Sequence, residues 1–425
     1  MGEPKSIAIV GAGVFGLSLA VALSLSKHDV TVFDQHRYNR TEYQPGADDQ
    51  VQAASVDHNK IFRVSYGTKL HYQRLAMESR QAWIKHDVER ARDGIEEGKL
   101  FMPCDMLRIQ PTEKLGALEK ETLANMEREG LRDTQFVKSD PKDRERARKR
   151  GLDSKLLEFN IPDENPPKTF EAVLDSLAGY TKSSSACLYF YRVADVQGVK
   201  FRFGPEEGKF DSLVEESIPE SNRKRAIGLK TKDGVVHKAD VVVIAAGSFS
   251  TQLLPELSYH LESSGGSVVT FKIDKDNTEL WGKYSPARFP VMTWKSAKRN
   301  SDGKDIGSFT NFQPAPKNVP FTQRGQWSVP LPSKESSSVP QPALDAIRNF
   351  VSIFLPEFKD APFYSTKLCW YTDSLDNSFV VDYVPTYSDK SVFVCTGGSG
   401  HGAKFLPVLG EVNHPITIKC QIGND

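Results

Sequence analysis

Three glycines and one aspartate near the start of the chain have the types and the spacing of a dinucleotide site. Gly11, Gly13 and Gly16 follow a short apolar run, and Asp34 ends the next apolar run. The first glycine permits a tight turn, the second lets backbone N–H groups approach a pyrophosphate, and the third lets a helix pack closely on a strand. The carboxylate of Asp34 can accept hydrogen bonds from ribose hydroxyls. The pattern predicts a nucleotide site, and the alternative is a glycine-rich turn in an unrelated α/β protein.

The elements that must hold this site are a strand, a helix and a second strand. We expect the strands at residues 6–10 and 30–34 and the helix at residues 17–26, with Val14 and Phe15 in the turn between them. A helix N-terminus carries partial positive charge and unpaired N–H donors, so a diphosphate is stabilised there. These residues do not distinguish NAD from FAD.

Two later apolar runs are expected to reach the same sheet. Residues 239–247 are rich in β-branched side chains and end at Gly247, which is typical of a buried parallel strand passing close to a nucleotide. Residues 392–396 form another such run and lead into a second glycine turn. That turn contains Gly398, Gly400, His401 and Gly402. It offers a further set of convergent N–H donors, and we expect a helix to begin near His401.

Two cations lie in an apolar stretch after the nucleotide pattern. Lys60 and Arg63 are interleaved with Ile61, Phe62 and Val64. Charges among apolar neighbours require a partner. One interpretation is a clamp on an anion, and the other is a pair of surface cations at a helix end.

The remaining pattern separates helical from strand-rich regions. Helical spacing of apolar residues is found at residues 70–97, 170–177 and 343–355. Residues 266–354 otherwise alternate strand-like runs with proline-rich turns, which predicts an antiparallel sheet in a separate substrate domain.

Composition limits the classes of function. The 425 residues predict two packed units, and the formal net charge of zero argues against a nucleic-acid or anionic-membrane partner. No apolar run approaches the roughly 20 residues of a membrane span. The five cysteines lack CxxC spacing, so we expect no metal site and no disulfide framework. Because neither a signal peptide nor a peroxisomal signal is recognisable, we expect a cytoplasmic location. Separately, we expect a monomer.

Five segments together resemble the FAD-dependent amine oxidases, a family that includes monomeric sarcosine oxidase, pipecolate and saccharopine oxidases and fungal fructosyl amine oxidases. The segments are GAGVFG at Gly11–Gly16 with Asp34, KIFRVSYG at Lys60–Gly67, ADVVVIAAG at Ala239–Gly247, CWYTDS at Cys369–Ser374 and GGSGHGAKF at Gly397–Phe405. They span nearly the whole chain in the family's order, and the last two are specific.

The resemblance implies an α/β protein with a Rossmann-like FAD-binding domain and a second, antiparallel-sheet substrate domain. We assign the FAD-binding domain to residues 1–80, 165–258 and 366–425, and the substrate domain to residues 81–164 and 259–365. The nucleotide is then FAD, and the residues expected to bind it include both glycine turns, Asp34, Lys60 and Gly247.

The resemblance also implies roles for single residues. Cys369 would bond the flavin 8α-methyl group as a thioether, although a cysteine in a strand is more often a small core residue. Tyr371, on the same strand face, would line the substrate pocket. Arg63 and Lys404 match two cations that hold the substrate carboxylate, whereas isolated cations are usually structural ion-pair residues. His401 would tune the flavin or pack on it, although a lone histidine is more often simply hydrogen-bonded.

The implied reaction is the oxidation of a secondary amine or N-substituted amino acid of the sarcosine, pipecolate, saccharopine or fructosyl amino acid class. Hydride passes to flavin N5, the imine hydrolyses, and oxygen is reduced to hydrogen peroxide. The alternatives are an NAD-dependent dehydrogenase and a catalytically impaired flavin-binding remnant.

Two departures from the family pattern motivate the second alternative. The lysine that activates oxygen has no clear counterpart, and the candidates are Lys295, Lys298 and Lys304. The tail after Gly410 lacks the family's amphipathic helix, because Pro415 ends any helix early.

Overall fold

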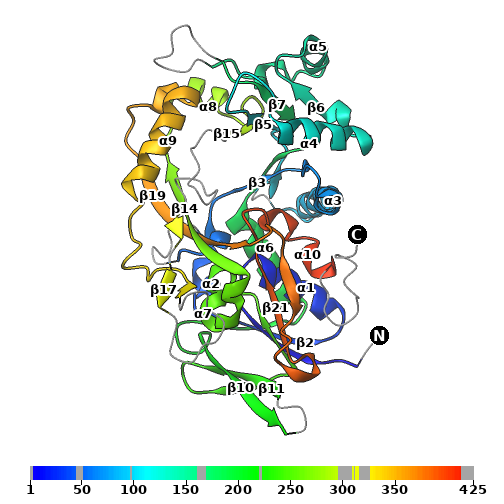
Figure 1. Cartoon of the computed structure of the whole chain (residues 1–425), viewed down its shortest axis with the longest axis vertical. Coiled ribbons are helices and arrows are strands. Elements are labelled where there is room, and N and C mark those ends of the chain that lie inside the picture. The colour runs from blue at the N-terminus through cyan, green and yellow to red at the C-terminus, as the bar shows by residue number, and fades with distance from the viewer. Residues whose placement is uncertain are drawn as a thin grey trace.

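The protein is described by a computed structural model that covers residues 3–44, 51–95, 98–159, 169–219, 223–294, 309–310, 312–314 and 326–412. These residues form a mixed α/β fold with several sheets. Figure 1 shows that the sheet carrying the N-terminal strand occupies the lower half of the molecule, and that a second group of strands and helices lies above it.

The largest sheet gathers strands from distant parts of the chain. Its members are β1 (Ser6–Val10), β2 (Asp29–Asp34), β9 (Lys200–Phe203), β13 (Val241–Ile244), β20 (Val380–Tyr383) and β21 (Val392–Thr396). The order is β20–β21–β13–β1–β2–β9, and all pairs are parallel except β20–β21. Strand β13 is buried throughout, which is the physical reason for its continuous β-branched run. The predicted meeting of β1, β2, β13 and β21 in one sheet is confirmed.

Helix α1 (Val14–Leu25) follows the first glycine turn and contacts α6 (Ser183–Val196) and α10 (Leu409–Val412). The hydroxyl of Ser18 in α1 donates to the carbonyl of Leu406 at 2.6 Å and accepts from the amide of Gly410 at 2.8 Å. The late segment is therefore held on the first helix up to the end of the described chain. The tail from residue 413, including Pro415, lies outside the described residues.

A long antiparallel pair forms the second major unit. Strand β14 (Leu261–Thr270) pairs over ten residues with β19 (Ser365–Ser374), and β16 (Phe309–Thr310) extends this sheet. Cys369 lies opposite Gly266 in this register. The pairing crosses the boundary that we drew at residue 366, and the domain division itself stays a prediction.

The upper part of the molecule is built on a four-stranded sheet of order β15–β5–β7–β6. Its strands are β5 (Met106–Ile109), β6 (Gln135–Val137), β7 (Ala172–Asp175) and β15 (Val291–Trp294), accompanied by α4 (Ala117–Arg128) and α5 (Pro141–Lys149). The β15–β5 pair is parallel, so this sheet is not purely antiparallel. A smaller sheet of order β3–β8–β4 lies between the two parts, with β3 at Lys60–Phe62, β8 at Gly179–Thr181 and β4 at Phe101–Met102.

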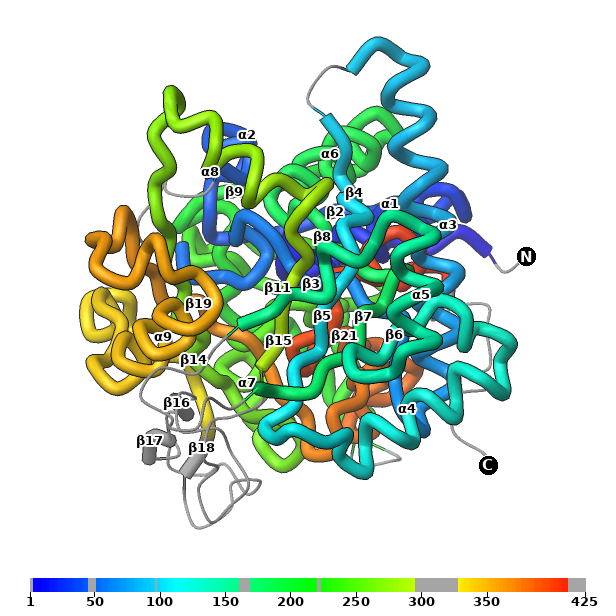
Figure 2. Tube along the Cα trace, turned by 90° about the horizontal axis from the view of Figure 1, so that it is seen from above, coloured from blue at the N-terminus to red at the C-terminus, as the bar shows by residue number. Residues whose placement is uncertain are grey.

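Two long helices flank the upper part on opposite sides. Figure 2, which views the molecule from above, shows α9 (Gln341–Phe354) beside β14 and β19 on one side, and α3 (Leu70–Arg92) on the other. The further elements are α2 (Tyr38–Thr41), α7 (Ser250–Leu253), α8 (Thr278–Lys283), β10 (Phe210–Ile218), β11 (Arg223–Thr231), β12 (Val236–Lys238), β17 (Phe312–Pro314) and β18 (Gln326–Ser328). Among the helices of the described chain, none has the length and apolar character that crossing a bilayer requires.

Two of the expected helices are wrong. Residues 172–175 form β7, which is buried along its whole length and pairs with β5 on one side and β6 on the other, so its apolar run reflects a central strand. After His401 the chain forms only a 3₁₀ turn at Ala403–Phe405 before α10.

Candidate active site

One cavity of about 1270 Å³ extends from the first glycine turn to strand β19. Gly11, Gly13 and Asp34 line it, and so do Cys369 and Lys404. The first three residues follow β1 or end β2, so this part of the cavity lies at the carboxyl edge of the parallel sheet, where α/β folds bind nucleotides. Residues separated by more than 350 positions therefore share one space.

The first glycine turn has the geometry that its sequence predicts. Gly11 has φ +110°, and a Cβ atom there would lie 2.5 Å from the carbonyl oxygen of Ala245. A Cβ atom on Gly16 would overlap the carbonyl oxygen of Gly11, so Gly16 packs the helix against the turn and does not line the cavity. Gly13, Val14 and Phe15 do line it.

Asp34 has a structural partner at the turn. Its carboxylate accepts the amide of Ala12 at 2.8 Å and the amide of His36 at 2.9 Å. These bonds tie the end of β2 to the glycine turn. Each carboxylate oxygen has a second lone pair, and Asp34 lines the cavity, so it remains available to ribose hydroxyls.

The start of α1 suits a diphosphate. Gly13 is its N-cap residue, no side chain caps the helix, and its first turn holds no acidic residue. The unpaired N–H groups of a helix start need an acceptor, and here they begin at residues that line the cavity. These features, with Gly11 leaving no room for a side chain, fit a dinucleotide such as FAD.

The second glycine turn packs directly on the first. A Cβ atom on Gly402 would lie 2.9 Å from the ring of Phe15, and one on Gly398 would lie 3.3 Å from it. Gly400 has φ +68° and also lines the cavity. Gly247, with φ +54°, reaches the cavity from the end of β13. The chain therefore brings the predicted cofactor-binding glycines, apart from Gly16, to one surface.

Arg63 and Lys404 come together around an intervening tyrosine. The Nζ atom of Lys404 donates to the hydroxyl of Tyr66 at 2.8 Å, and the guanidinium carbon of Arg63 lies 4.7 Å from the centre of the Tyr66 ring. Lys404 is 2% exposed. Burial lowers the pKa of Lys404 well below its usual value, and the charge of Arg63 lowers it further. Lys404 lines the cavity, whereas Arg63 and Tyr66 are not among the lining residues.

Within the ranges that the structure describes, neither Arg63 nor Lys404 makes an ion pair with a carboxylate. A buried ammonium without a counter-charge is costly. Among the described residues, the two cations therefore lack an anion.

Lys60 behaves differently from these two cations. It lies in β3 rather than at a helix end, so that interpretation is wrong. Its Nζ atom lies 2.5 Å from a carboxylate oxygen of Asp57, which pairs the charge. Both residues line the cavity beside Cys369.

Cys369 and Tyr371 face the cavity from β19. Cys369 is 3% exposed, and burial raises the pKa of its thiol; Asp57 raises that pKa further, while Lys60 and Lys367 lower it. The ring of Tyr371 lies 3.3 Å from the Cβ position of Gly266 on β14. Their predicted shared face is confirmed, while the flavin bond stays a prediction.

His401 lines the cavity and makes two hydrogen bonds. Its Nδ1 atom lies 3.1 Å from the hydroxyl of Tyr66, and its Nε2 atom lies 3.1 Å from the carbonyl oxygen of Asn377. Burial lowers the pKa of His401 to about 3, and the charge of Lys404 contributes in the same direction. The ring is therefore neutral at ordinary pH.

Tyr66 was missed as a site residue in the sequence. It belongs to the KIFRVSYG segment, in which the charged residues Lys60 and Arg63 were the predicted site residues. Its spacing from Arg63 carries no signal of its own, because the contact with Lys404 joins residues 338 positions apart.

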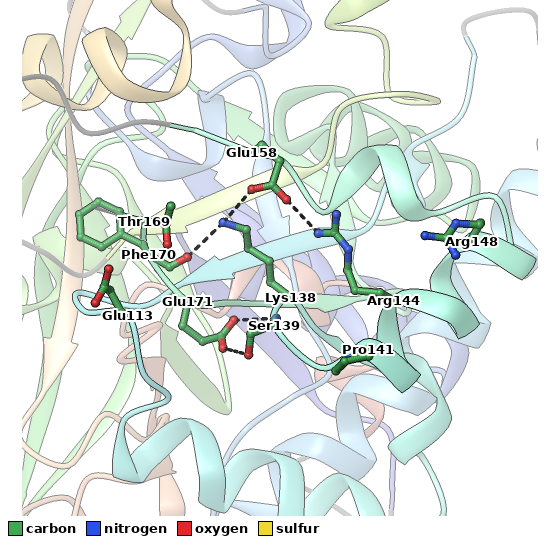
Figure 3. A pocket seen from close by; sticks show the side chains of 10 residues that line it. All are labelled: Glu113, Lys138, Ser139, Pro141, Arg144, Arg148, Glu158, Thr169, Phe170 and Glu171. Carbon is green, nitrogen blue, oxygen red and sulfur yellow. Dashed lines mark hydrogen bonds and ion pairs between the residues drawn. The ribbon is translucent and has the colours of Figure 1, made fainter. Parts of the chain in front are cut away.

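A second pocket of about 580 Å³ lies in the upper part of the molecule near α5 (Figure 3). Glu158 there lies between two of its cations, at 3.4 Å from Lys138 and 3.0 Å from Arg144. Ser139 donates to Glu171 in the same pocket. These charges neutralise one another, so this pocket offers no comparable anion site.

Two further questions from the sequence concern the oxygen-activating lysine and metal binding. The candidate lysines Lys295, Lys298 and Lys304 lie outside the described residues. Among the residues that are described, no group of three or more potential ligands could hold a metal ion.

Comparison with known proteins gives a consistent result over the whole chain. The sequence model of a family described as FAD dependent oxidoreductase matches residues 6–412. The chain is 28% identical to L-saccharopine oxidase of Schizosaccharomyces pombe, over 96% of this chain and 88% of that protein. It is 22% identical to monomeric sarcosine oxidase of a Bacillus species, over 99% of this chain and 93% of that protein.

The solved structures that resemble it include a modified fructosyl peptide oxidase from Aspergillus nidulans. The two share a TM-score of 0.73 at 22% identity, over 96% of this chain and 89% of that one. The fold class expected from the sequence is confirmed by this likeness.

Proposed function

The chain belongs to the FAD dependent oxidoreductase family, and from that premise we propose that it oxidises a secondary amine or N-substituted amino acid that carries a carboxylate. It is a flavin enzyme of the amino-acid and amine oxidase class, acting on CH–NH groups of small molecules with oxygen as acceptor. FAD, rather than NAD, is its nucleotide, so the dehydrogenase alternative is set aside.

The observation that carries the proposal is that two cations, Lys404 in the cavity lining and Arg63 beside Tyr66, make no ion pair within the described chain. A substrate carboxylate supplies the anion that Lys404 and Arg63 lack within the described chain. Saccharopine and sarcosine, which name two of the relatives, are both N-substituted amino acids. The carboxylate would approach Lys404 directly, with Arg63, which lies against the Tyr66 ring, adding its charge.

The residues of the chain would act mainly by positioning. Bound FAD supplies the two-electron acceptor. Lys404 would fix the carboxylate, Tyr371 would border the carbon to be oxidised, and the glycine turn at Gly398–Gly402 would direct N–H groups toward negative charge that develops on the ring system. His401, being neutral, would add no competing charge beside Lys404.

The finer proposal for the cofactor is covalent attachment through Cys369. The support for it is that the thiol lines the cavity together with the glycine turns. Burial and the charge of Asp57 raise the pKa of this thiol, and Lys60 and Lys367 lower it, so the unliganded protein holds it as a thiol.

The test uses the purified holoenzyme without oxygen. We expect N-methyl and cyclic secondary amino acids to bleach the flavin absorbance, and matched amines without the carboxylate to bleach it far more slowly. Peroxide should form when oxygen is returned. Bleaching by none of a broad panel would contradict the proposal and favour a non-catalytic remnant.

A further inference from the structure

Three polar side chains form a continuous hydrogen-bonded row, and two of them, Lys404 and His401, line the cavity. Lys404 Nζ contacts the Tyr66 hydroxyl at 2.8 Å, that hydroxyl contacts His401 Nδ1 at 3.1 Å, and His401 Nε2 contacts the carbonyl oxygen of Asn377 at 3.1 Å. The row begins at a fully buried ammonium and ends at an exposed turn between β19 and β20.

The chemistry of the two ends fixes the direction of every bond. A backbone carbonyl only accepts, so His401 carries its proton on Nε2 and its Nδ1 is an acceptor. Tyr66 therefore donates its O–H to His401, and its remaining lone pairs face Lys404. The ammonium of Lys404 can only donate, and the oxygen of Tyr66 accepts its hydrogen bond.

The far end of the row is held in place by α3. Lys69, the residue before that helix, donates to the carbonyl of Asp376 at 2.6 Å, and the hydroxyl of Tyr72 accepts from the amide of Phe379 at 2.8 Å. The carbonyl of Asn377 is thus anchored from both sides. A single orientation of His401 follows from this anchoring.

The surroundings of Lys404 otherwise oppose its charge. Arg63 and Lys69 are positive charges near the row, and the carboxylate of Asp376 lies at its far end, beside Asn377. The titratable neighbours are Tyr66, Tyr72 and His401. On the side of α3, Ser79 and Trp83 donate to the backbone carbonyl of Lys404 and not to its ammonium. Within the described chain, Tyr66 supplies the hydrogen-bond acceptor recorded for Nζ.

We propose that Tyr66 is a positioning residue for Lys404, which accepts a hydrogen bond that keeps the ammonium charged and aimed at the cavity, and that His401 fixes the Tyr66 hydroxyl in its accepting direction. The inference rests on the proposed function, because it assigns Lys404 to the substrate carboxylate. Tyr66 itself need not touch the substrate.

The test is calorimetric titration of the holoenzyme with acetate from neutral to alkaline pH, which needs no turnover. Because binding requires the charged amine, acetate affinity in the wild-type protein should fall as the pH rises through the pKa of Lys404. Tyr66→Phe removes the acceptor, which disfavours the charged form and lowers that pKa. Since hydrogen bonds to charged groups correspond to roughly one to two pKa units, the loss of affinity should begin about one to two pH units lower.

Two further variants separate positioning from general loosening. Tyr189→Phe is the matched control: it removes a tyrosine hydroxyl that lies 3.3 Å from the Nδ1 atom of another histidine, His86, and that is not part of the cavity lining. The pH at which acetate affinity falls should stay in place. His401→Leu should lower the pH at which acetate affinity falls, as Tyr66→Phe does, but by a smaller amount, because the Tyr66 hydroxyl becomes free to turn. Retained FAD and an unchanged melting temperature identify folded variants.

The outcomes distinguish this inference from the proposed function. If acetate fails to bind the wild-type protein, the carboxylate contact is wrong and this inference falls with it. If acetate binds and the pH at which its affinity falls does not move in Tyr66→Phe, or moves equally in Tyr189→Phe, only the role of Tyr66 is overturned. Should Tyr66→Phe not fold, His401→Leu decides the matter. If the pH at which acetate affinity falls is the same in that variant as in the wild-type protein, the proposal that His401 directs the Tyr66 hydroxyl toward Lys404 is overturned.

Discussion

Cys369 differs from the other cysteines of the described chain in where its side chain lies. Cys104, Cys187 and Cys395 are buried away from the main cavity, whereas Cys369 lines it. If this thiol bonds the flavin, acid precipitation of the wild-type protein leaves the yellow colour in the pellet. Cys369→Ser should release the colour into the supernatant while the native protein still binds FAD, since the glycine turns are intact. Absorbance of the two fractions measures this.

The matched control for this prediction is Cys104→Ser, which alters another buried thiol. Its colour should stay with the pellet as in the wild-type protein. Retention of colour by Cys369→Ser would show that the attachment, if any, is elsewhere.

Single residues were predictable where one backbone conformation or one strand face decided the outcome. Gly11 and Gly16 are glycines because a Cβ atom would meet backbone oxygen, and that follows from the motif. Lys60 and Tyr66 were not predictable in the same way. The partner of Lys60 is Asp57 three residues earlier, and the partner of Tyr66 is a late lysine, so side-chain direction rather than spacing decided both.

Between elements, a buried charge network holds the segment that carries Arg63 and Tyr66. Arg108 of β5 donates to Glu119 of α4 at 2.7 Å, to Asp175 of β7 at 3.2 Å and to Ser65 at 3.0 Å. All of these side chains are buried. The network therefore links the upper sheet, through Ser65, to the segment that carries Arg63 and Tyr66.

Removing the central cation of that network should be costly. Arg108→Met leaves Glu119 and Asp175 buried without their partner, and breaking a buried ion pair in this way destabilises proteins by about 3–5 kcal/mol. Thermal unfolding of the holoenzyme measures the effect as a large drop in Tm.

Arg74→Met serves as the control for burial. Arg74 also makes two hydrogen bonds to one carboxylate, that of Glu129, but on the surface. Its loss should change Tm little, because exposed pairs contribute little. Equal effects of the two substitutions would contradict the importance of burial in the Arg108 network.

Elements were predictable from sequence when their apolar pattern matched their exposure. The strands β1, β13 and β21 carry nearly continuous apolar runs because both faces of a central parallel sheet are covered. The same pattern misled at residues 170–177, since a short buried strand and a buried helical turn cannot be distinguished by periodicity alone. The network around Arg108 had no sequence signal, because its members come from separate elements.

At the scale of the whole molecule, one cavity brings together residues from distant parts of the chain. The N-terminal glycine turn, the late glycine turn and β19 all line it. The order of motifs indicated this arrangement, but the long β14–β19 pairing that carries Cys369 and Tyr371 did not follow from either motif. The monomeric state and the cytoplasmic location stay predictions.

The most direct test of the account compares how the enzyme discriminates between an N-methyl amino acid and the same amine without its carboxylate. Steady-state peroxide formation gives kcat/KM for both compounds in the wild-type protein, in Arg63→Ala and in Arg80→Ala. Arg80→Ala is the control, because it removes another half-buried arginine, whose Nε atom donates to the carbonyl of Leu177. We predict that Arg63→Ala lowers kcat/KM for the acid about 10–100-fold, mainly through KM, since truncating one partner of a charge pair costs about 1.4–2.8 kcal/mol at a half-buried site. The amine and the Arg80→Ala control should be unaffected. An acid-to-amine ratio that stays the same in Arg63→Ala would contradict the claim that this cavity recognises a carboxylate.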